Sequence, residues 1–186
     1  MKFLSVISAM MLPAALYAAG ASTAHFSHFD YKGFDDYYAE NPLNSPSQLY
    51  NPILPGWNSD PSICRTGDDY WLVTSTFGYF PGLPLYHSKD LVNWTLERNV
   101  LDRPSQLPYL KGQSLDKGGI YAPHISYNPH NGKYYVVATD TGLKEGHFYV
   151  TATDPAGDWS DPVWLKGIDG IDPSFFFDDD GSAYIV

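Results

Sequence analysis

The amino-acid sequence predicts an all-β protein built from repeated antiparallel units, and three observations support this prediction. Its aromatic residues are mostly tyrosine and phenylalanine, with 15 Tyr and 10 Phe, and such residues favour strands. Gly and Pro contribute 16 and 15 residues, which is typical of short strands joined by tight turns. A short motif that contains proline also recurs along the chain. With 186 residues, of which 44% are hydrophobic, the chain can bury a core.

Each predicted unit begins with one residue followed by proline, a polar residue and an apolar residue. The motif stands at residues 60–63 (Asp-Pro-Ser-Ile), 122–125 (Ala-Pro-His-Ile) and 172–175 (Asp-Pro-Ser-Phe). Each copy leads across a turn to a second strand, which we expect at residues 70–74, 134–137 and 184–186. The copies start 62 and 50 residues apart, which leaves room for four strands in each unit. Repeated antiparallel four-stranded sheets are typical of the blades of a β-propeller.

Turn signals separate the predicted strands. They stand at Pro-Gly in residues 81–82, Asn-Gly in residues 131–132 and Asp-Gly in residues 180–181. The last of these follows a run of acidic residues at 178–180, which we interpret as a solvated hairpin turn. A calcium loop is disfavoured there because the spaced ligands of such a loop are absent.

Two of the three units begin with Asp, whereas the second begins with Ala. The first strand of each propeller blade lines the central channel, so we expect Asp60, Ala122 and Asp172 to converge on one axial site. Proline is present in all three units, whereas Asp is present in two. This suggests that the proline is needed for the fold of every unit and that each Asp has a role of its own. An Asp that merely caps a turn is the structural alternative. Two carboxyl groups held by a rigid β scaffold are the catalytic groups that most glycosidases use to cleave a glycosidic bond.

The N-terminal region is predicted to be an export signal followed by a leader. Residues 1–21 contain a basic start, an apolar run over residues 3–16 and small residues at the end, which is the pattern of a secretory signal peptide. The apolar run is short for a membrane span, so we expect a secreted or periplasmic protein and no membrane anchor. Residues 22–50 are polar and aromatic without a sustained period and form the predicted leader. The organised domain is expected over residues 51–186.

Composition restricts the partners. The formal net charge is -10 and the isoelectric point is about 4.7. Nucleic-acid affinity comes mainly from clustered Lys and Arg, so we expect no nucleic-acid partner, and a neutral or positively charged partner fits better. The single cysteine, Cys64, excludes an intrachain disulfide and is expected to be a buried small apolar residue.

Five segments together carry a resemblance to a known enzyme family. They are residues 51–63 (Asn-Pro-Ile-Leu-Pro-Gly-Trp-Asn-Ser-Asp-Pro-Ser-Ile), 74–82 (Thr-Ser-Thr-Phe and Phe-Pro-Gly), 87–94 (His-Ser-Lys-Asp-Leu-Val-Asn-Trp), 118–123 (Gly-Gly-Ile-Tyr-Ala-Pro) and 171–176 (Ile-Asp-Pro-Ser-Phe-Phe). In order and spacing these segments resemble glycoside hydrolase family 43, especially its β-xylosidase and α-L-arabinofuranosidase members. The resemblance implies a five-bladed β-propeller, of which about two and a half blades are present here. It also implies hydrolysis of xylosidic or arabinofuranosidic bonds with inversion.

The resemblance further implies roles for the two repeated carboxylates. In the family one Asp is the general base that activates water, a second Asp orients the acid and raises its pKa, and a Glu is the general acid. The base motif falls on Asp60 and the pKa modulator motif on Asp172. The roles agree with physical expectation, because a nearby anion keeps an acid protonated by like-charge repulsion. Inversion requires roughly 6.5 to 9.5 Å between base and acid to admit a water molecule.

Three aromatic residues are expected to contact substrate. Phe77 and Tyr121 match positions where the family places apolar walls of the sugar subsite, and Trp57, three residues before Asp60, is interpreted as a rim aromatic. A core or blade-packing role is the equal alternative for each. No cofactor and no metal are expected in the chemistry, although a structural calcium on the propeller axis, which some relatives hold, stays open.

The general acid has no match in this chain. The family pattern expects a Glu followed by Gly and Pro in a later blade, whereas the glutamates here are Glu40, Glu97 and Glu145, none in that context. We therefore expect an N-terminal fragment, inactive alone, of an inverting glycosidase for xylo- or arabino-oligosaccharides. A non-catalytic carbohydrate-binding propeller and an inactive truncated product are the alternatives. The choices between xylose and arabinose and between exo and endo attack stay open.

Overall fold

The computed structural model describes residues 40–107, 118–141 and 146–186. The predicted signal peptide and most of the predicted leader lie outside the described residues. Spatial contacts divide the chain into Met1–Pro42 and Leu43–Val186, and the elements below all belong to the second unit. Among the described residues there is no helix long and apolar enough to cross a membrane.

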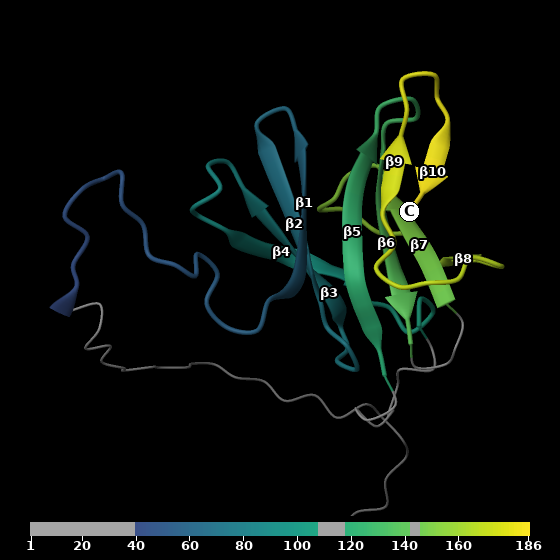
Figure 1. The fold of residues 1–186 in the computed structure, drawn as a ribbon, viewed down its shortest axis with the longest axis horizontal. Coiled ribbons are helices and arrows are strands. Elements are labelled where there is room, and N and C mark those ends of the chain that lie inside the picture. Colours follow the sequence, from purple (N-terminus) through teal and green to yellow (C-terminus); the bar gives the residue numbers. More distant parts are fainter. Residues whose placement is uncertain (1–39, 108–117, 142–145) are drawn as a thin grey trace, which may run out of the picture. The chain divides into compact units, whose positions relative to one another are not determined.

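Ten β-strands form the regular structure of this unit, as far as it is described (Figure 1). The first blade is an antiparallel sheet of β1 (Ser59–Thr66), β2 (Asp69–Ser75), β3 (Gly82–Ser88) and β4 (Thr95–Leu101). The second blade contains β5 (Ile120–Asn128), β6 (Lys133–Asp140), β7 (Gly146–Ala152) and β8 (Val163–Leu165). A third sheet is the hairpin of β9 (Phe175–Phe177) and β10 (Ala183–Ile185). The prediction of an all-β chain with about two and a half blades is confirmed.

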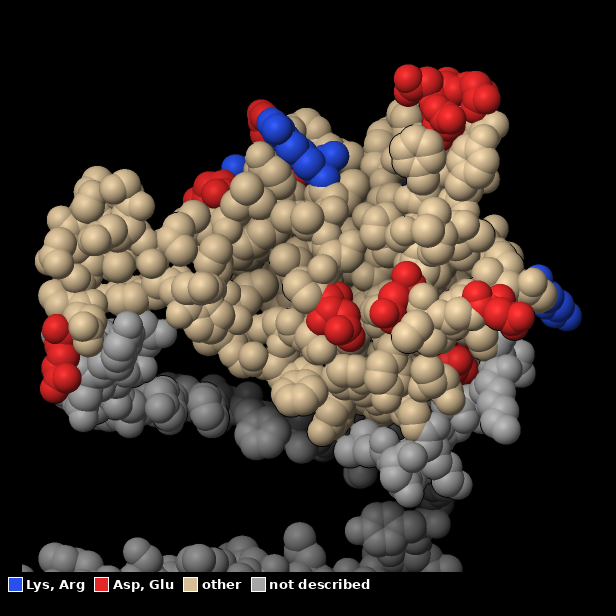
Figure 2. All heavy atoms as spheres, in the orientation of Figure 1, with Lys and Arg blue, Asp and Glu red and all other residues tan. Residues whose placement is uncertain are grey.

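Glycines form the predicted turns between the strands. Gly132 has a φ of 67° and donates its backbone N–H to the carbonyl of Asn128 at 2.9 Å, which closes the turn between β5 and β6. Gly181 has a φ of 88° and makes the same kind of bond to Asp178 at 3.0 Å. Both conformations favour glycine because it lacks a Cβ. The acidic residues 178–180 lie at the tip of the β9–β10 hairpin, seen as red spheres at the top right of Figure 2, so the predicted hairpin turn is confirmed.

Apolar side chains from both blades build one core. Its fully buried members include Val73, Leu85 and Val100 from the first blade and Ile125, Val136 and Phe148 from the second. Cys64 is half-buried and packs against this core, so its predicted burial is confirmed only in part. Burial raises the pKa of the Cys64 thiol, which keeps the thiol protonated and unreactive near neutral pH.

The blades stack with the same face of each sheet turned toward the preceding blade. In the second blade, Ile125 and Val136 pair across β5 and β6, and they are 1% and 0% exposed. The equivalent pair in the first blade is Ile63 and Leu72, and Ile63 is 49% exposed. The difference arises because β5 packs on β1 and β2, which covers the second pair. The stacking direction is that of a propeller.

The repeated motif also links successive blades by hydrogen bonds. The Ser62 hydroxyl accepts the backbone N–H of Ile125 at 3.1 Å, and the His124 Nδ1 accepts that of Phe175 at 3.3 Å. In both cases the third residue of one motif accepts from the fourth residue of the next. This periodic bond explains why the third residue carries an acceptor, and it gives His124 a structural partner.

Candidate active site

The backbone turns abruptly at the first residue of each motif. The strand register shifts within residues 59–62 of β1 and within residues 121–124 of β5, so each strand carries one extra residue there. Asp60, Ala122 and Asp172 have φ angles of 50°, 42° and 57°. Non-glycine residues rarely adopt such angles, and they often do so at functional sites. Because Ala122 shares the conformation, the backbone shape belongs to the repeat and the carboxylates are a separate feature.

The three motifs line one open hollow of about 310 Å³. Its lining residues are Asp60, Pro61, Ser62, Ala122, Pro123, His124, Asp172, Pro173 and Ser174. The structure therefore brings Asp60, Ala122 and Asp172 together, as the sequence predicts. Asp60 and Asp172 are both exposed to solvent; Asp60 lies near the start of β1, and Asp172 shortly precedes β9. Exposed carboxylates in one hollow can exchange protons with a bound molecule or with water.

The Asp60 carboxylate is anchored by a serine that sequence reasoning did not single out. The Ser75 hydroxyl, at the end of β2, donates a hydrogen bond to Asp60 Oδ2 at 2.6 Å. The same hydroxyl accepts the backbone N–H of Ala122 at 2.7 Å. Ser75 lies in the Thr-Ser-Thr-Phe segment that carries part of the family resemblance, and this was the available signal.

His124 lines the same hollow, and its Nδ1 accepts a hydrogen bond from the backbone N–H of Phe175 within the protein. Burial lowers the pKa of His124, because desolvation penalises the charged imidazolium. A neutral ring is also what the bond requires, since a protonated Nδ1 has no lone pair to accept the N–H of Phe175. In this geometry His124 is a hydrogen-bonded structural residue.

The three aromatic residues expected to contact substrate form a row. The rings of Trp57 and Phe77 lie 5.9 Å apart at 74°, and those of Phe77 and Tyr121 lie 4.7 Å apart at 67°. Such edge-to-face pairs are a favoured aromatic arrangement. Trp57 is 75% exposed, whereas Phe77 and Tyr121 are half-buried. Tyr121 directly precedes Ala122 in the chain, and Ala122, not the three rings, is among the residues that line the hollow.

A close backbone approach fixes the middle of this row. Phe77 exchanges two backbone hydrogen bonds with Ile120, at 3.0 and 2.9 Å, and so joins the first blade to the start of β5. Gly119 precedes Ile120, and a Cβ at Gly119 would overlap the carbonyl carbon and oxygen of Phe77. Gly119 is therefore needed for the contact that positions the Phe77 ring.

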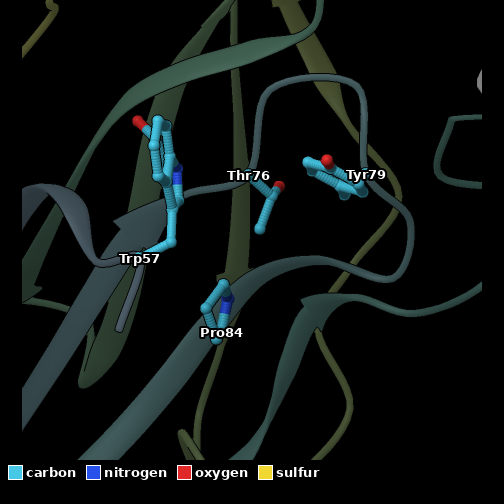
Figure 3. A pocket seen from close by; sticks show the side chains of 5 residues that line it. Trp57, Thr76, Tyr79 and Pro84 are labelled. Carbon is cyan, nitrogen blue, oxygen red and sulfur yellow. The ribbon is translucent and has the colours of Figure 1, made fainter. Parts of the chain in front are cut away.

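A second pocket of about 430 Å³ adjoins the candidate base (Figure 3). It is lined by Trp57, Ser75, Thr76, Tyr79 and Pro84. Figure 3 shows the Trp57 and Tyr79 rings on opposite sides of Thr76, and Tyr79 is 61% exposed. Ser75 connects this pocket to Asp60 through its hydrogen bond. Tyr79 was not identified from the sequence, because nothing in its pattern distinguishes a pocket wall from a loop residue.

Within residues 40–107, 118–141 and 146–186, no group of three or more His, Cys, Asp or Glu side chains is placed to hold a metal ion. The described part of the hollow thus offers two carboxylates and an imidazole already used as an acceptor. The chemistry that these residues support directly is proton transfer by a carboxylate.

Comparison with known sequences places this chain in a family. The model for Glycosyl hydrolases family 43 matches residues 49–186. A non-reducing end alpha-L-arabinofuranosidase, BoGH43B of Bacteroides ovatus, is 56% identical over 138 residues, covering 73% of this chain and 25% of the relative. A xylosidase/arabinosidase of Butyrivibrio fibrisolvens is 53% identical over 138 residues, covering 73% of this chain and 26% of the relative. The chain thus spans about a quarter of the length of these curated relatives.

Solved structures give the same assignment. A GH43_12 protein from the capybara gut metagenome superimposes with a TM-score of 0.74 and 51% identity, covering 82% of this chain and 28% of that protein. A xylan beta-1,4-xylosidase of Bacillus halodurans gives a TM-score of 0.66 and 44% identity, with 74% of this chain and 27% of that protein covered. These neighbours are five-bladed β-propellers, and the two blades and the hairpin described here correspond to part of one. The chain belongs to glycosyl hydrolases family 43.

Proposed function

We propose that the whole protein containing this chain is an exported inverting glycosidase that hydrolyses O-glycosyl bonds in xylo- or arabino-oligosaccharides. The observation that carries the proposal is the exposed Asp60 carboxylate, held by Ser75 at the hollow where the three motifs meet. The names of the relatives support the substrate class, since the two described above are an alpha-L-arabinofuranosidase and a xylosidase/arabinosidase. A net charge of -10 fits a neutral sugar substrate better than a polyanion.

Asp60 is proposed to act as the general base. Its free carboxylate oxygen accepts a proton from a water molecule while the water oxygen attacks the anomeric carbon. The bond between that carbon and the leaving oxygen breaks, and the leaving oxygen takes a proton from a general acid. Attack from the face opposite the leaving group inverts the configuration. The reaction requires a base, an acid and water, and no cofactor.

The general acid is proposed to be a Glu supplied by a part of the protein beyond this chain. Glu97 does not line the hollow, Glu40 belongs to the other unit of the chain, and Glu145 lies outside the described residues. Because the acid would be absent, we propose that this chain alone does not turn over substrate. This agrees with the quarter share of the relatives' length that it spans.

Asp172 is proposed to modulate the acid. Its exposed side chain lies at the same hollow as Asp60, so a third carboxyl group entering there meets a second anion. A neighbouring negative charge raises the pKa of a carboxylic acid, which keeps it protonated and able to donate. An Asp at this position can also orient the acid by accepting its hydrogen bond.

The aromatic row is proposed to hold the sugar. Trp57, Phe77 and Tyr121 form a row of contacting rings, and Trp57 lines the pocket that also contains Ser75, the partner of Asp60. A flat apolar ring face suits the C–H face of a pyranose or a furanose, while the hydroxyls of the sugar remain free for polar contacts. The exposed Trp57 is suited to the rim of such a site.

The test is an assay of the whole protein on aryl β-xylosides and aryl α-L-arabinofuranosides. We expect hydrolysis of at least one class, with NMR of the first product showing inverted anomeric configuration. The Asp60→Ala variant should lose nearly all turnover while it keeps the thermal melting profile of the unaltered protein. Binding of the oligosaccharides without any turnover by the unaltered protein would favour a carbohydrate-binding propeller instead.

A further inference from the structure

We propose that Ser75 is a positioning residue for the reaction, which fixes the orientation of the Asp60 carboxylate and couples it to the contact between the first two blades. The inference rests on the proposed role of Asp60 as general base. Ser75 is not proposed to touch substrate with its hydroxyl, since both hydrogen-bonding directions of that group are already used within the protein.

The direction of the Ser75 proton follows from its two partners. A serine hydroxyl carries one proton, and it can accept through its oxygen lone pairs. The backbone N–H of Ala122 is a donor, so at 2.7 Å it must bind a lone pair of Ser75 Oγ. The proton of Ser75 is then free to point at Asp60 Oδ2, 2.6 Å away. This is a charge-assisted bond, which is stronger than a bond between neutral groups.

Burial makes this bond a fixed support. Ser75 is 1% exposed, so water has little access to compete for its hydroxyl. Asp60 itself is exposed, and an exposed Asp side chain would otherwise sample several rotamers. Holding Oδ2 leaves Oδ1 as the oxygen that takes the proton from water. Because small misplacements of a catalytic group have large effects on rate, the orientation of this oxygen matters.

Comparison of the two blades indicates that the bond from Ser75 to Asp60 depends on the carboxylate and is not a general feature of the repeated unit. Ser75 pairs with Ser59 in the first blade, and Thr139 pairs with Tyr121 in the second, so Ser75 and Thr139 occupy equivalent positions. The second blade has Ala122 where the first has Asp60. There the Thr139 hydroxyl bonds to His147 Nδ1 at 3.0 Å instead. Both blades therefore carry a hydroxyl at this strand position. Only in the first blade does this hydroxyl bond to the carboxylate at the first residue of the motif.

Two variants separate positioning from packing. Ser75→Ala removes the hydroxyl, whereas Ser75→Thr keeps it, and Thr139 shows that a threonine is accommodated at the equivalent strand position. Thr66→Val is the control for the contact between the blades, because Thr66 is not among the residues that line the hollow. The Thr66 hydroxyl bonds to the Tyr134 hydroxyl at 2.5 Å across the two blades, and this bond involves no carboxylate. All variants are made in the whole protein, and kcat, KM and the melting temperature are measured.

We expect Ser75→Ala to lower kcat about tenfold to a hundredfold, with KM changed by less than about threefold. Ser75→Thr should restore kcat to within a few fold, because it keeps the hydroxyl that holds Asp60 Oδ2. Thr66→Val should lower the melting temperature and change kcat by less than about threefold.

The proposal is overturned if Ser75→Ala keeps the original kcat, or if Ser75→Thr is as impaired as Ser75→Ala. It also fails if Thr66→Val lowers kcat as far as Ser75→Ala does, since the contact between blades would then be responsible. Failure of the proposed function is detected separately, because it would appear as ordinary turnover in Asp60→Asn.

Discussion

Asp60 and Asp172 line the same open hollow, and each has a positive φ and directly precedes a proline. Ala122 adopts the same backbone conformation between them without a carboxylate. The propeller repeat therefore supplies three equivalent positions around the hollow, and two of them carry an acid. This arrangement is the basis of the different tasks that we propose for the two carboxylates.

Asp172→Asn should separate its role from that of the base. Removing the anion removes the like-charge repulsion that holds the proton on the general acid. The basic limb of the kcat/KM profile of the whole protein should then move to lower pH by roughly one unit. An unmoved basic limb together with a normal kcat would contradict the modulator role.

His124 should make stability depend on pH near neutrality. Its pKa is lowered by burial in the folded protein, so the unfolded chain binds the proton more readily, and stability should fall as pH drops below about 6.5. Protonation also breaks the Nδ1 bond to Phe175. Unfolding by urea between pH 5 and pH 8 measures this effect.

The matched variant for this test is His124→Ser, because Ser62 performs the same linking role in the first motif. The variant should show a flatter dependence of unfolding free energy on pH over the same interval. An equally steep decline in His124→Ser would assign the pH dependence to another group.

Gly119→Ala should destabilise the protein and disturb the aromatic row. The added Cβ overlaps backbone atoms of Phe77, and backbone cannot move aside as a flexible side chain can. A loss of about 1 to 3 kcal/mol in unfolding free energy is expected, together with a raised KM. Gly157→Ala is the control, since its Cβ would lie 3.2 Å from the nearest atom, the carbonyl oxygen of Asp154. Equal effects from the two substitutions would refute the close-approach argument.

Trp57→Ala should weaken substrate binding with little effect on stability. The side chain is 75% exposed, so little packing is lost. Loss of an aromatic contact worth about 0.5 to 1.5 kcal/mol should raise KM about twofold to twelvefold while kcat changes less. Trp159→Ala offers the opposite pattern, because Trp159 is buried in the core and its loss should lower the melting temperature. A Trp57 variant with an unchanged KM would remove it from the substrate site.

The strands and turns could be predicted from the sequence where single residues restrict the local backbone conformation. Prolines at fixed places in the motif and glycines at residues 132 and 181 restrict the backbone by themselves, so strands and turns followed from the pattern. The convergence of Asp60 and Asp172 followed from the geometry of a propeller, which needs no side-chain detail.

The support of the site depends on long-range geometry and could not be predicted in the same way. Ser75 reaches Asp60 only because the bulge in β1 turns the carboxylate toward the end of β2, and the N–H of Ala122 arrives from another blade. Likewise, the need for Gly119 appears only when Phe77 and Ile120 pair across blades. A short hydroxyl or a missing Cβ carries no periodic signal, so neither stands out in the sequence.

The most direct test of the central claim is the turnover of Asp60→Asn in the whole protein, measured on aryl β-xylosides and aryl α-L-arabinofuranosides. Asn keeps the size of the side chain but cannot take a proton from water. We expect kcat to fall about 100-fold to 10,000-fold with an unchanged melting temperature. Ordinary turnover by a properly folded Asp60→Asn protein would contradict the assignment of Asp60 as the general base.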